Sequence, residues 1–267
     1  MNRQRQAQIE LHRALAKDYD RVRRELVGTR SLHDYWNEEI YEWLPKQKDL
    51  RILDNMCGTG DFLDFLSTKY SFVTGADISF DMISLTANKS RQSLKGLVCC
   101  DTEKLPFATA SFDVVNVRGA LHHINPISGA LREMHRILRP GGMIILSEPS
   151  DDFVVVRKVR ESLYKRLDYF DDDEKTFLSE ELIVGLTNAG FSVHKTKRFG
   201  FIAYTLLGFP DIIPVLEYFS YVPFAKYFSR VLIGIDKLLA KVPVIKNWSL
   251  IVFVAGKKLS PPTTASR

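Results

Sequence analysis

Cysteine is scarce in this chain of 267 residues, which holds three: Cys57, Cys99 and Cys100. An odd number, with two of the three adjacent, offers neither a disulfide framework nor a metal-ligand spacing, and this favours a reducing compartment. Long apolar runs are also absent, since no uncharged apolar stretch reaches the roughly 18 residues of a membrane-spanning helix. The first residues, MNRQRQAQIELHR, lack the apolar core of a secretion signal. We therefore expect a cytoplasmic protein without bound metal.

A surplus of positive charge is missing from most of the chain. The net charge of +5 comes from residues 199–267, where eight Lys and Arg side chains stand against three acidic ones, while residues 1–198 are neutral overall. A nucleic-acid-binding protein normally spreads basic residues along a groove, with aromatic side chains between them. The distribution seen here therefore indicates no nucleic-acid partner.

Strand and helix patterns alternate along the chain, and no internal repeat interrupts them. The predicted strands cover 50–54, 71–76, 96–100, 112–117, 142–148, 191–197 and 249–255. Helices are predicted over 61–69, 80–93, 127–138 and 179–189, with Ser179 as an N-cap, after a helical N-terminal region over 3–43. This alternation predicts an α/β fold, in which helices cover both faces of a parallel sheet.

The first predicted strand ends in a glycine turn, Asp54-Asn55-Met56-Cys57-Gly58-Thr59-Gly60. A strand, such a turn and a helix make the first half of a nucleotide site. A dinucleotide site has a third glycine where this chain has Leu63, so a NAD(P)-dependent oxidoreductase is the weaker alternative. Asp77 ends the second strand and could bind a ribose diol, because a carboxylate only accepts hydrogen bonds. Asp101 follows the third strand and could accept the adenine amino group, which completes a pattern suited to S-adenosylmethionine.

Several segments carry a resemblance to a known family. They are LDNMCGTGDF from residue 53, GADISFDMI from 75, CDTEKLPFATASFDVV from 100, RGALHHI from 118 and EMHRILRPGGMIILSE from 133. In residues 50–150 the chain resembles the class I S-adenosylmethionine-dependent methyltransferases of the small-molecule type, and it is similar to those of ubiquinone and menaquinone biosynthesis. The resemblance implies a seven-stranded Rossmann-like sheet in the order 3-2-1-4-5-7-6, with the last strand antiparallel. It also implies methyl transfer to a small-molecule acceptor.

The resemblance also implies which residues bind the cofactor. They are Tyr19, Asp54, Asn55, Met56, Gly58, Gly60, Asp77, Ile78, Met82, Asp101, Thr102, Asn116 and Arg118. Gly58 and Gly60 would line the methionine moiety, Asp77 would bind the ribose, and Ile78 and Met82 would flank the adenine. Asp101 and the backbone of Thr102 would read the adenine edge. Residues 116–119 would face the methionine amino group, and Tyr19 would close over the cofactor.

Met56 departs from the family pattern, which usually has glycine and sometimes alanine at this position. If the position needs a positive φ, methionine is strained there by roughly 1 kcal/mol or more. If glycine only provides clearance, methionine could sit beside the cofactor thioether. Both alternatives stay open at this point. They also leave room for a non-catalytic, membrane-associated protein that binds S-adenosylmethionine.

Methyl transfer needs little side-chain chemistry, because the sulfonium is already activated and orientation supplies much of the catalysis. An oxygen nucleophile would need a general base, for which His123 is slightly favoured over His122. The alternative is that one of the two histidines only caps a helix or packs against the loop. Glu148 is a further candidate, although an exposed acid before Pro149 is the preferred interpretation. In the acceptor-pocket segment 153–173, the candidates are Tyr164, Asp168 and Tyr169.

An apolar and aromatic insert over 199–247 separates the last two strands, where a short hairpin would suffice. Helical spacing places Lys226, Arg230, Lys237 and Lys241 within a ~60° arc, opposite Phe228, Val231, Leu232, Ile235, Leu238 and Leu239. The insert could cover a hydrophobic acceptor, lie in a membrane surface, or form a buried subdomain or homodimer contact. The expected units are therefore a helical lid (1–45), an α/β domain (46–198), an acceptor cap (199–247), a final strand (248–258) and a disordered tail (259–267).

Overall fold

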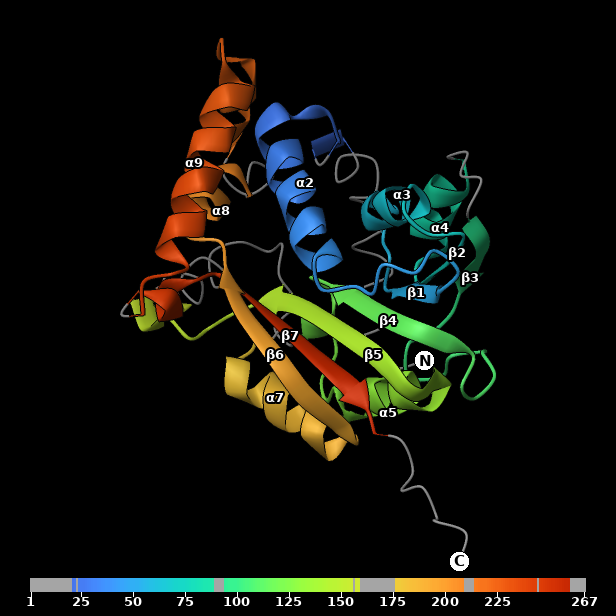
Figure 1. Ribbon diagram of the computed structural model, residues 1–267. Coiled ribbons are helices and arrows are strands. Elements are labelled where there is room, and N and C mark those ends of the chain that lie inside the picture. Colours follow the sequence, from blue (N-terminus) through green and yellow to red (C-terminus); the bar gives the residue numbers. More distant parts are fainter. Residues whose placement is uncertain are drawn as a thin grey trace, which may run out of the picture.

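The computed structural model describes residues 21–22, 24–88, 94–155, 157–158, 176–208, 214–243 and 245–259. Its strands are β1 (Arg51–Asn55), β2 (Phe72–Asp77), β3 (Leu94–Cys99), β4 (Phe112–Arg118), β5 (Leu138–Pro149), β6 (Phe191–Phe199) and β7 (Ile251–Lys258). The helices of the α/β part are α2 (Val27–Tyr41), α3 (Asp61–Ser67), α4 (Phe80–Ala87), α5 (Ser128–Ile137) and α7 (Ser179–Asn188), with a short 3-10 turn η1 (Leu121–His123). Figure 1 shows the sheet with α2 and α3 over one face and α5 and α7 over the other.

The strands form one seven-stranded sheet in the order β3-β2-β1-β4-β5-β7-β6. Strands β1 to β5 pair in parallel, whereas β7 lies between β5 and β6 and is antiparallel to both. The predicted strand order and the antiparallel last strand are confirmed. Because β1, β2 and β4 are parallel neighbours, their carboxyl ends lie at one edge of the sheet.

Both faces of the sheet are buried, and β1 shows how. Ile52 and Leu53 are fully buried, yet they belong to two different clusters of the core. Ile52 packs in the cluster that contains Trp36 of α2, whereas Leu53 packs in the cluster that contains Leu131 of α5. Successive strand side chains point to opposite faces, so these two neighbours show that helices cover β1 on both sides.

Several predicted boundaries differ from the observed ones, among them that of helix 80–93, which is observed as α4 over Phe80–Ala87. Strand β5 begins at Leu138 rather than near residue 142, and its pairing with β4 is interrupted by a register shift between Phe112 and Val114. Ser179 is the first residue of α7 and not its N-cap, which is Leu178. The Ser179 hydroxyl and backbone N–H both donate to the Asp152 carboxylate, so a residue 27 positions away caps this helix.

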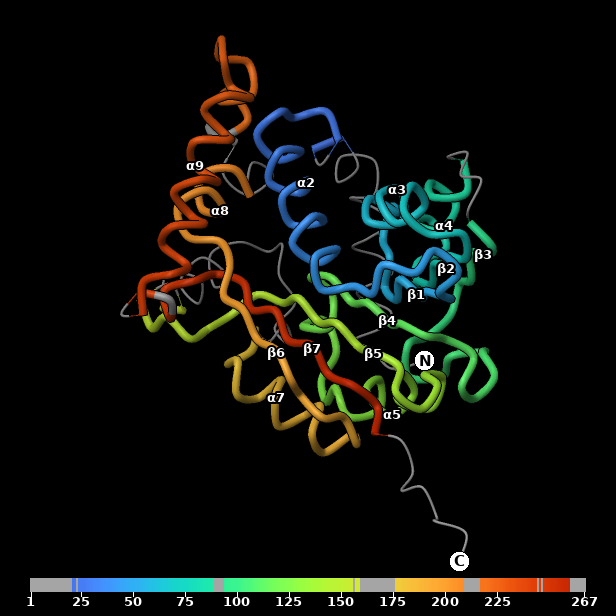
Figure 2. Tube along the Cα trace, viewed as in Figure 1, coloured from blue at the N-terminus to red at the C-terminus, as the bar shows by residue number. Residues whose placement is uncertain are grey.

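The insert between β6 and β7 contains α8 (Ile202–Leu207), η2 (Pro214–Tyr221), α9 (Ala225–Leu239) and η3 (Lys246–Trp248). It leaves the sheet at the edge where β5 ends, because Phe199 pairs with Ile251, which in turn pairs with Pro149. In Figures 1 and 2, α8 and α9 stand beside α2 at this end of the sheet. No helix among the described residues is both long and apolar enough to cross a membrane.

Helix α9 presents apolar side chains both to the core and to the surface. Its described apolar side chains do not form one buried side, because Leu232 faces the core whereas Phe228, Val231, Ile235 and Leu238 are 37–64% exposed. The physical reason is that α9 packs on α2 and α8 through small and polar residues as well, namely Ala225, Ser229 and Asp236. Residues 1–20, with the first part of the expected lid, and 260–267, with most of the tail, lie outside the described residues.

Candidate active site

Polar side chains gather where the parallel strands end. Asp54 and Asn55 end β1, Asp77 ends β2, and Asn116 lies directly beside Asp54 in the β1–β4 pairing. Asp101 follows β3 after a single residue. Residues far apart in the sequence are thus brought to one edge of the sheet, which is where open α/β sheets bind ligands.

The glycine turn after β1 has three residues in left-handed backbone conformation: Met56 at φ 60°, Gly58 at φ 54° and Gly60 at φ 78°. Of the two alternatives for Met56, the strained one is therefore observed, because a methionine Cβ crowds the following carbonyl oxygen at this φ. A Cβ placed on Gly58 would meet no atom within 4 Å. The turn thus has open space beside Gly58, into which a ligand fits.

Asp77 ties this turn to the second strand. Its Oδ2 accepts a hydrogen bond from the Gly58 backbone N–H at 2.8 Å, and its Oδ1 accepts one from Ser79 N–H at 2.9 Å. The Thr86 hydroxyl of α4 donates to the Gly58 carbonyl at 3.0 Å. A carboxylate offers about four lone-pair sites, so Asp77 can hold the turn and accept from a ligand as well. Ile78, which follows Asp77, is half-buried at the same edge.

The loops after β1 and β3 are joined by buried polar groups. Asn55 Nδ2 donates to the Thr102 hydroxyl at 2.5 Å, and both residues are buried. The neighbouring Asp101 carboxylate accepts from the Glu103 backbone N–H at 2.9 Å. Met82, on the first turn of α4, is 2% exposed and packs inside the molecule. These contacts hold the loops after β1 and β3 at a fixed distance from each other.

Asp54 and Asn116 form a fully buried pair between β1 and β4. Asn116 Nδ2 donates to Asp54 Oδ1 at 2.8 Å. Burial raises the pKa of Asp54 to about 7, against the opposing effects of the Asn116 hydrogen bond and the nearby Arg118. Asn116 Oδ1 is buried and has no hydrogen-bond partner among the described residues. A buried carbonyl oxygen in this state can accept from a donor that the described residues do not supply.

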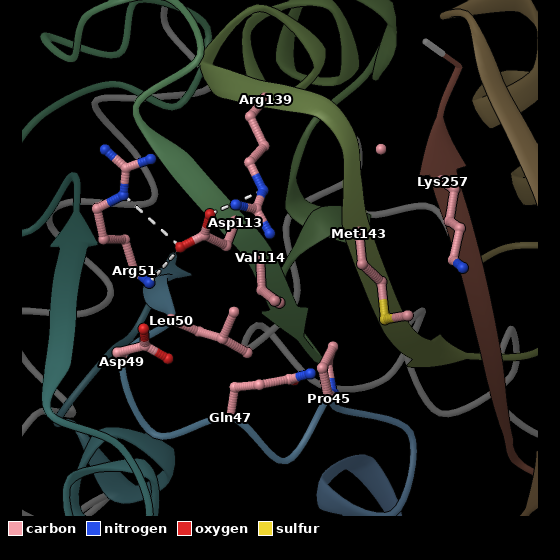
Figure 3. A pocket seen from close by; sticks show the side chains of 11 residues that line it. Pro45, Gln47, Asp49, Leu50, Arg51, Asp113, Val114, Arg139, Met143 and Lys257 are labelled. Carbon is pink, nitrogen blue, oxygen red and sulfur yellow. Dashed lines mark hydrogen bonds and ion pairs between the residues drawn. The ribbon is translucent and has the colours of Figure 1, made fainter.

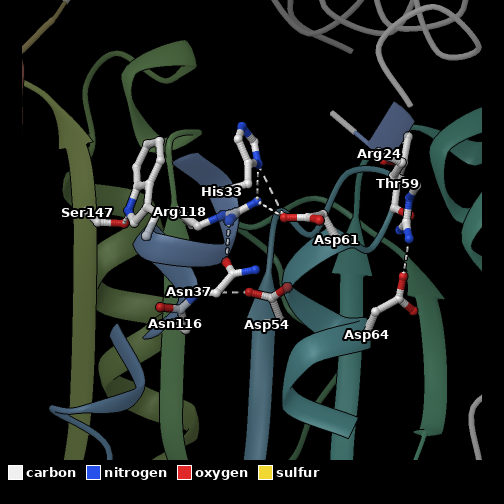
Figure 4. A network of polar contacts seen from close by, with 11 residues as sticks. Arg24, His33, Asn37, Asp54, Thr59, Asp61, Asp64, Asn116, Arg118 and Ser147 are labelled. Atoms are coloured by element: carbon white, nitrogen blue, oxygen red, sulfur yellow. Dashed lines mark hydrogen bonds and ion pairs between the residues drawn. The ribbon is translucent and has the colours of Figure 1, made fainter. Parts of the chain in front are cut away.

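Arg118, the last residue of β4, connects the edge to helix α2 (Figure 4). Its guanidinium donates to Asp61 Oδ2 at 2.6 Å and to Asn37 Oδ1. Burial alone would raise the pKa of Asp61, but the charge of Arg118 and the hydrogen bond from His33 hold that pKa well below its usual value of 3.8. Asp61 opens α3 directly after the glycine turn. Helix α2 is therefore held against the site by a buried charge network.

The α2 side chains of this network were not among the predicted site residues. His33, Trp36 and Asn37 are all buried, and Trp36 Nε1 donates to the Ser147 hydroxyl of β5 at 3.1 Å. With Ile40 they follow the i, i+3, i+4, i+7 spacing of one helix face, which is the signal that could have identified them. Tyr19, expected on the same helical region, lies outside the described residues, as do Tyr164, Asp168 and Tyr169.

Comparisons with known proteins agree with this geometry. A family model described as a methyltransferase domain matches residues 53–146. A demethylmenaquinone methyltransferase of Staphylococcus aureus is 34% identical over 155 residues, which are 56% of this chain and 63% of that protein. The chain thus spans less than two thirds of the length of the curated relatives that it matches.

Solved structures share the fold. A methyltransferase in complex with the Haloferax volcanii Trm112 activator has a TM-score of 0.63 at 18% identity, covering 93% of this chain and 98% of that one. Phosphoethanolamine N-methyltransferase 2 of Haemonchus contortus, in complex with phosphomonomethylethanolamine and S-adenosylhomocysteine, has a TM-score of 0.57 at 19% identity, covering 85% and 53%. At these identities the likeness concerns the fold alone.

Residues 53–146, which contain the edge described above, are similar to methyltransferase domains. Domains of this class use S-adenosylmethionine, and the edge described above fits such a ligand. The Asp77 carboxylate suits a ribose diol, the space beside Gly58 leaves room for the ligand, and the unpaired Asn116 Oδ1 suits an ammonium group.

The methyltransferase domain has its two neighbouring histidines just beyond β4, with ring centres 4.1 Å apart. His122 Nδ1 lies 2.8 Å from Glu148 Oε2. Because a carboxylate only accepts, Nδ1 donates, and the neutral ring keeps its lone pair on Nε2. This contact orients the His122 ring and leaves Nε2 as its remaining acceptor.

Glu148 is not the exposed acid that the sequence suggested. It is fully buried, and its Oε1 accepts from the backbone N–H groups of Ala120 and Leu121 at 3.1 and 3.0 Å. A buried carboxylate is tolerated when hydrogen bonds satisfy it, and the turn that follows β4 presents its N–H groups to the end of β5. Glu148 therefore positions His122 and the η1 turn.

A cavity of about 550 Å³ lies at the other edge of the sheet (Figure 3). It is lined by the first residue of β1, Arg51, and by Asp113 near the start of β4. Asp113 is paired with Arg51 and with Arg139 at 2.8 Å. Since the amino ends of the parallel strands lie here, this cavity is separate from the site of the methyltransferase domain.

Proposed function

We propose that the chain transfers a methyl group from S-adenosylmethionine to a small, hydrophobic acceptor. The observation that carries the proposal is the Asp77 carboxylate, which holds the glycine turn through Gly58 and faces the edge where the cofactor fits. The named activity of the Staphylococcus aureus relative, methylation of demethylmenaquinone, supports an apolar acceptor of the quinone type. The scarcity of cysteine supports a cytoplasmic location.

In the proposed complex, each end of the cofactor has its own group of residues. Asp77 binds the ribose hydroxyls, while Ile78 and Met82 flank the adenine. The loop from Asp54 through Gly60 lines the methionine moiety, and Asn116 accepts from its ammonium group. Asp101 and Thr102 read the adenine edge, Arg118 fixes the end of β4, and Tyr19 closes the lid.

When bound, the cofactor supplies a methyl group already activated on a sulfonium sulfur. The chain then has to position the acceptor in line with that bond, exclude water, and remove a proton from the acceptor. We propose that His122 Nε2 takes this proton, and that Glu148 stabilises the imidazolium through the hydrogen bond at Nδ1. Helix α2, with residues 1–45, acts as the lid, and 199–247 acts as the acceptor cap.

The first test is calorimetric titration of the full chain with S-adenosylhomocysteine. Asp77→Ala should weaken binding by roughly 1–3 kcal/mol, the cost of losing hydrogen bonds to buried hydroxyl groups. The matched control is Asp49→Ala, because Asp49 is exposed at the opposite edge of the sheet. Equal affinities of the two variants for S-adenosylhomocysteine would refute the assignment of Asp77 to the ribose. Binding of NADH in place of S-adenosylhomocysteine would favour the oxidoreductase.

The second test measures methyl transfer to demethylmenaquinone across a range of pH. His122→Gln should lower kcat by about a hundredfold and remove the fall in activity on the acid side of the pH profile that protonation of a general base causes, without changing the affinity for S-adenosylhomocysteine. His194→Gln, on an exposed position of β6, is the matched control. A loss confined to His123→Gln would assign the base to His123 instead.

A further inference from the structure

Helix α9 has three faces. The first packs against α2 and α8 and contains the buried residues Ala225, Ser229, Leu232, Ile233 and Asp236. The Asp236 carboxylate accepts from the backbone N–H groups of Phe201 and Ile202 at 2.8 Å each, and from Ala203 at 3.1 Å. These bonds fix how α9 is rotated, and so determine which side chains point outward.

The second face is a basic row, formed by Lys226, Arg230, Lys237 and Lys241. All four are exposed and lie within a ~60° arc of the helix. The acidic residues of the described part of the insert are engaged elsewhere, because Glu217 forms an ion pair with Arg21 at 2.8 Å and Asp236 is buried. On the adjacent helix α2, Asp34 lies near Lys226, and the Tyr35 ring lies 4.6 Å from the Lys237 ammonium. Arg230 and Lys241 therefore carry most of the outward positive charge of the row.

The third face is an apolar ridge, made of Phe224, Tyr227, Phe228, Val231, Ile235 and Leu238. These side chains are between 37% and 84% exposed. Helical geometry places them beyond the basic row and away from the buried face, within an arc of about 100°. Phe224, the most exposed, is held at φ 66° directly before the helix. The neighbouring Tyr218, Tyr221 and Val222 are exposed as well, so the ridge extends onto η2.

We propose that α9 lies in the surface of an anionic lipid membrane, with the ridge among the acyl chains and the basic row at the phosphate groups. A helix with one apolar and one basic outer face has the pattern of interfacial helices, and each basic residue near an anionic surface adds to the attraction. A second copy of the chain that covers the ridge is the competing occupant, and the test below distinguishes it from lipid. In a membrane, the acyl chains contact the ridge and the phosphate groups at the surface contact the basic row.

The position of the insert gives this binding a consequence. Because the insert leaves the sheet at the carboxyl edge, beside Phe199, Ile251 and Pro149, the membrane and the site described above lie at the same end of the molecule. An acceptor dissolved in the lipid would then enter without crossing water. The membrane contact itself does not depend on methyl transfer, so the two can be tested separately.

The test is flotation of the full chain with vesicles of phosphatidylcholine and phosphatidylglycerol in equal parts, compared with pure phosphatidylcholine. The chain should float with the mixed vesicles only. Val231→Asp should weaken partitioning by about tenfold or more, because a charge enters the acyl region. The matched control is Val184→Asp on α7, since Val184 is 49% and Val231 43% exposed, and it should bind as the unaltered chain does.

The charge requirement is measured with Arg230→Gln/Lys241→Gln, which should lower partitioning about fivefold for each charge removed. Failure of the unaltered chain to float with the mixed vesicles overturns the proposal. So does a dimer in light scattering that Val231→Asp alone dissociates, because the ridge would then join two copies. Calorimetry with S-adenosylhomocysteine on the same samples distinguishes this failure from failure of the proposed cofactor site.

Discussion

The cofactor edge and the insert lie at the same end of the sheet, but different interactions hold them. The edge is fixed by buried and partly buried polar groups that pair with each other, such as Asp54 with Asn116 and Asp61 with Arg118. The insert is fixed by apolar packing and one buried carboxylate, Asp236, and it presents apolar side chains outward. We infer that the edge is built as a rigid receptor for one ligand, and the insert as an adaptable surface.

The largest expected difference between the two regions concerns arginine. Arg118→Met leaves the largely buried Asp61 carboxylate without its guanidinium partner, with only His33 beside it, and should lower the free energy of unfolding by about 3–5 kcal/mol. Arg230→Met, on the exposed row of α9, should change it by less than about 0.5 kcal/mol. Urea denaturation measures both. Similar losses for the two variants would mean that the cofactor edge does not depend on its charge network.

A smaller effect tests whether the insert has a rigid anchor of its own. Asp236→Ala leaves three backbone N–H groups at the start of α8 without an acceptor, which should cost about 2–3 kcal/mol. Asp236→Asn keeps one acceptor oxygen and should cost less. Hydrogen exchange at residues 201–203 should accelerate more in the alanine variant. If it does not, α8 is held by apolar packing alone.

The free energy of unfolding should depend on pH through the titration of Asp54. Burial raises the pKa of Asp54 from its usual 3.8 to about 7, so between these values the folded chain keeps a proton that the unfolded chain has lost. Stability therefore falls as pH rises through this window. Asp54→Asn removes this titration, so its stability relative to the unaltered chain should rise by on the order of 2 kcal/mol from pH 4 to pH 7. A constant difference would show that Asp54 titrates normally.

The smallest expected effect concerns Met56. Glycine has no Cβ to crowd the left-handed backbone, so Met56→Gly should stabilise the fold by about 1 kcal/mol. Met56→Ala keeps the strain and loses the packing of the longer side chain, so it should be less stable than either. Thermal denaturation gives the ranking. If calorimetry also finds that Met56→Gly binds S-adenosylhomocysteine more tightly, the strained backbone at Met56 weakens cofactor binding in the unaltered chain.

The sheet was predictable from the sequence because its signals are local. The alternation of patterns, the glycine turn from Gly58 to Gly60 and the acids at strand ends each need only a few neighbouring residues. The burial of Glu148 was not predictable in this way, because the N–H groups that satisfy it come from residues 120–122. The Asp152 cap on α7 was missed for the same reason.

The sequence by itself determined the order of strands and helices and the types of residue that meet at the carboxyl edge, since parallel pairing brings strand ends together whatever covers them. Only the tertiary structure decided that Arg118 binds Asp61 and Asn37, that His122 is oriented by Glu148, and that the apolar side of α9 points outward. The physical reason is that burial and pairing depend on partners far along the chain, whereas periodicity is set by the local backbone.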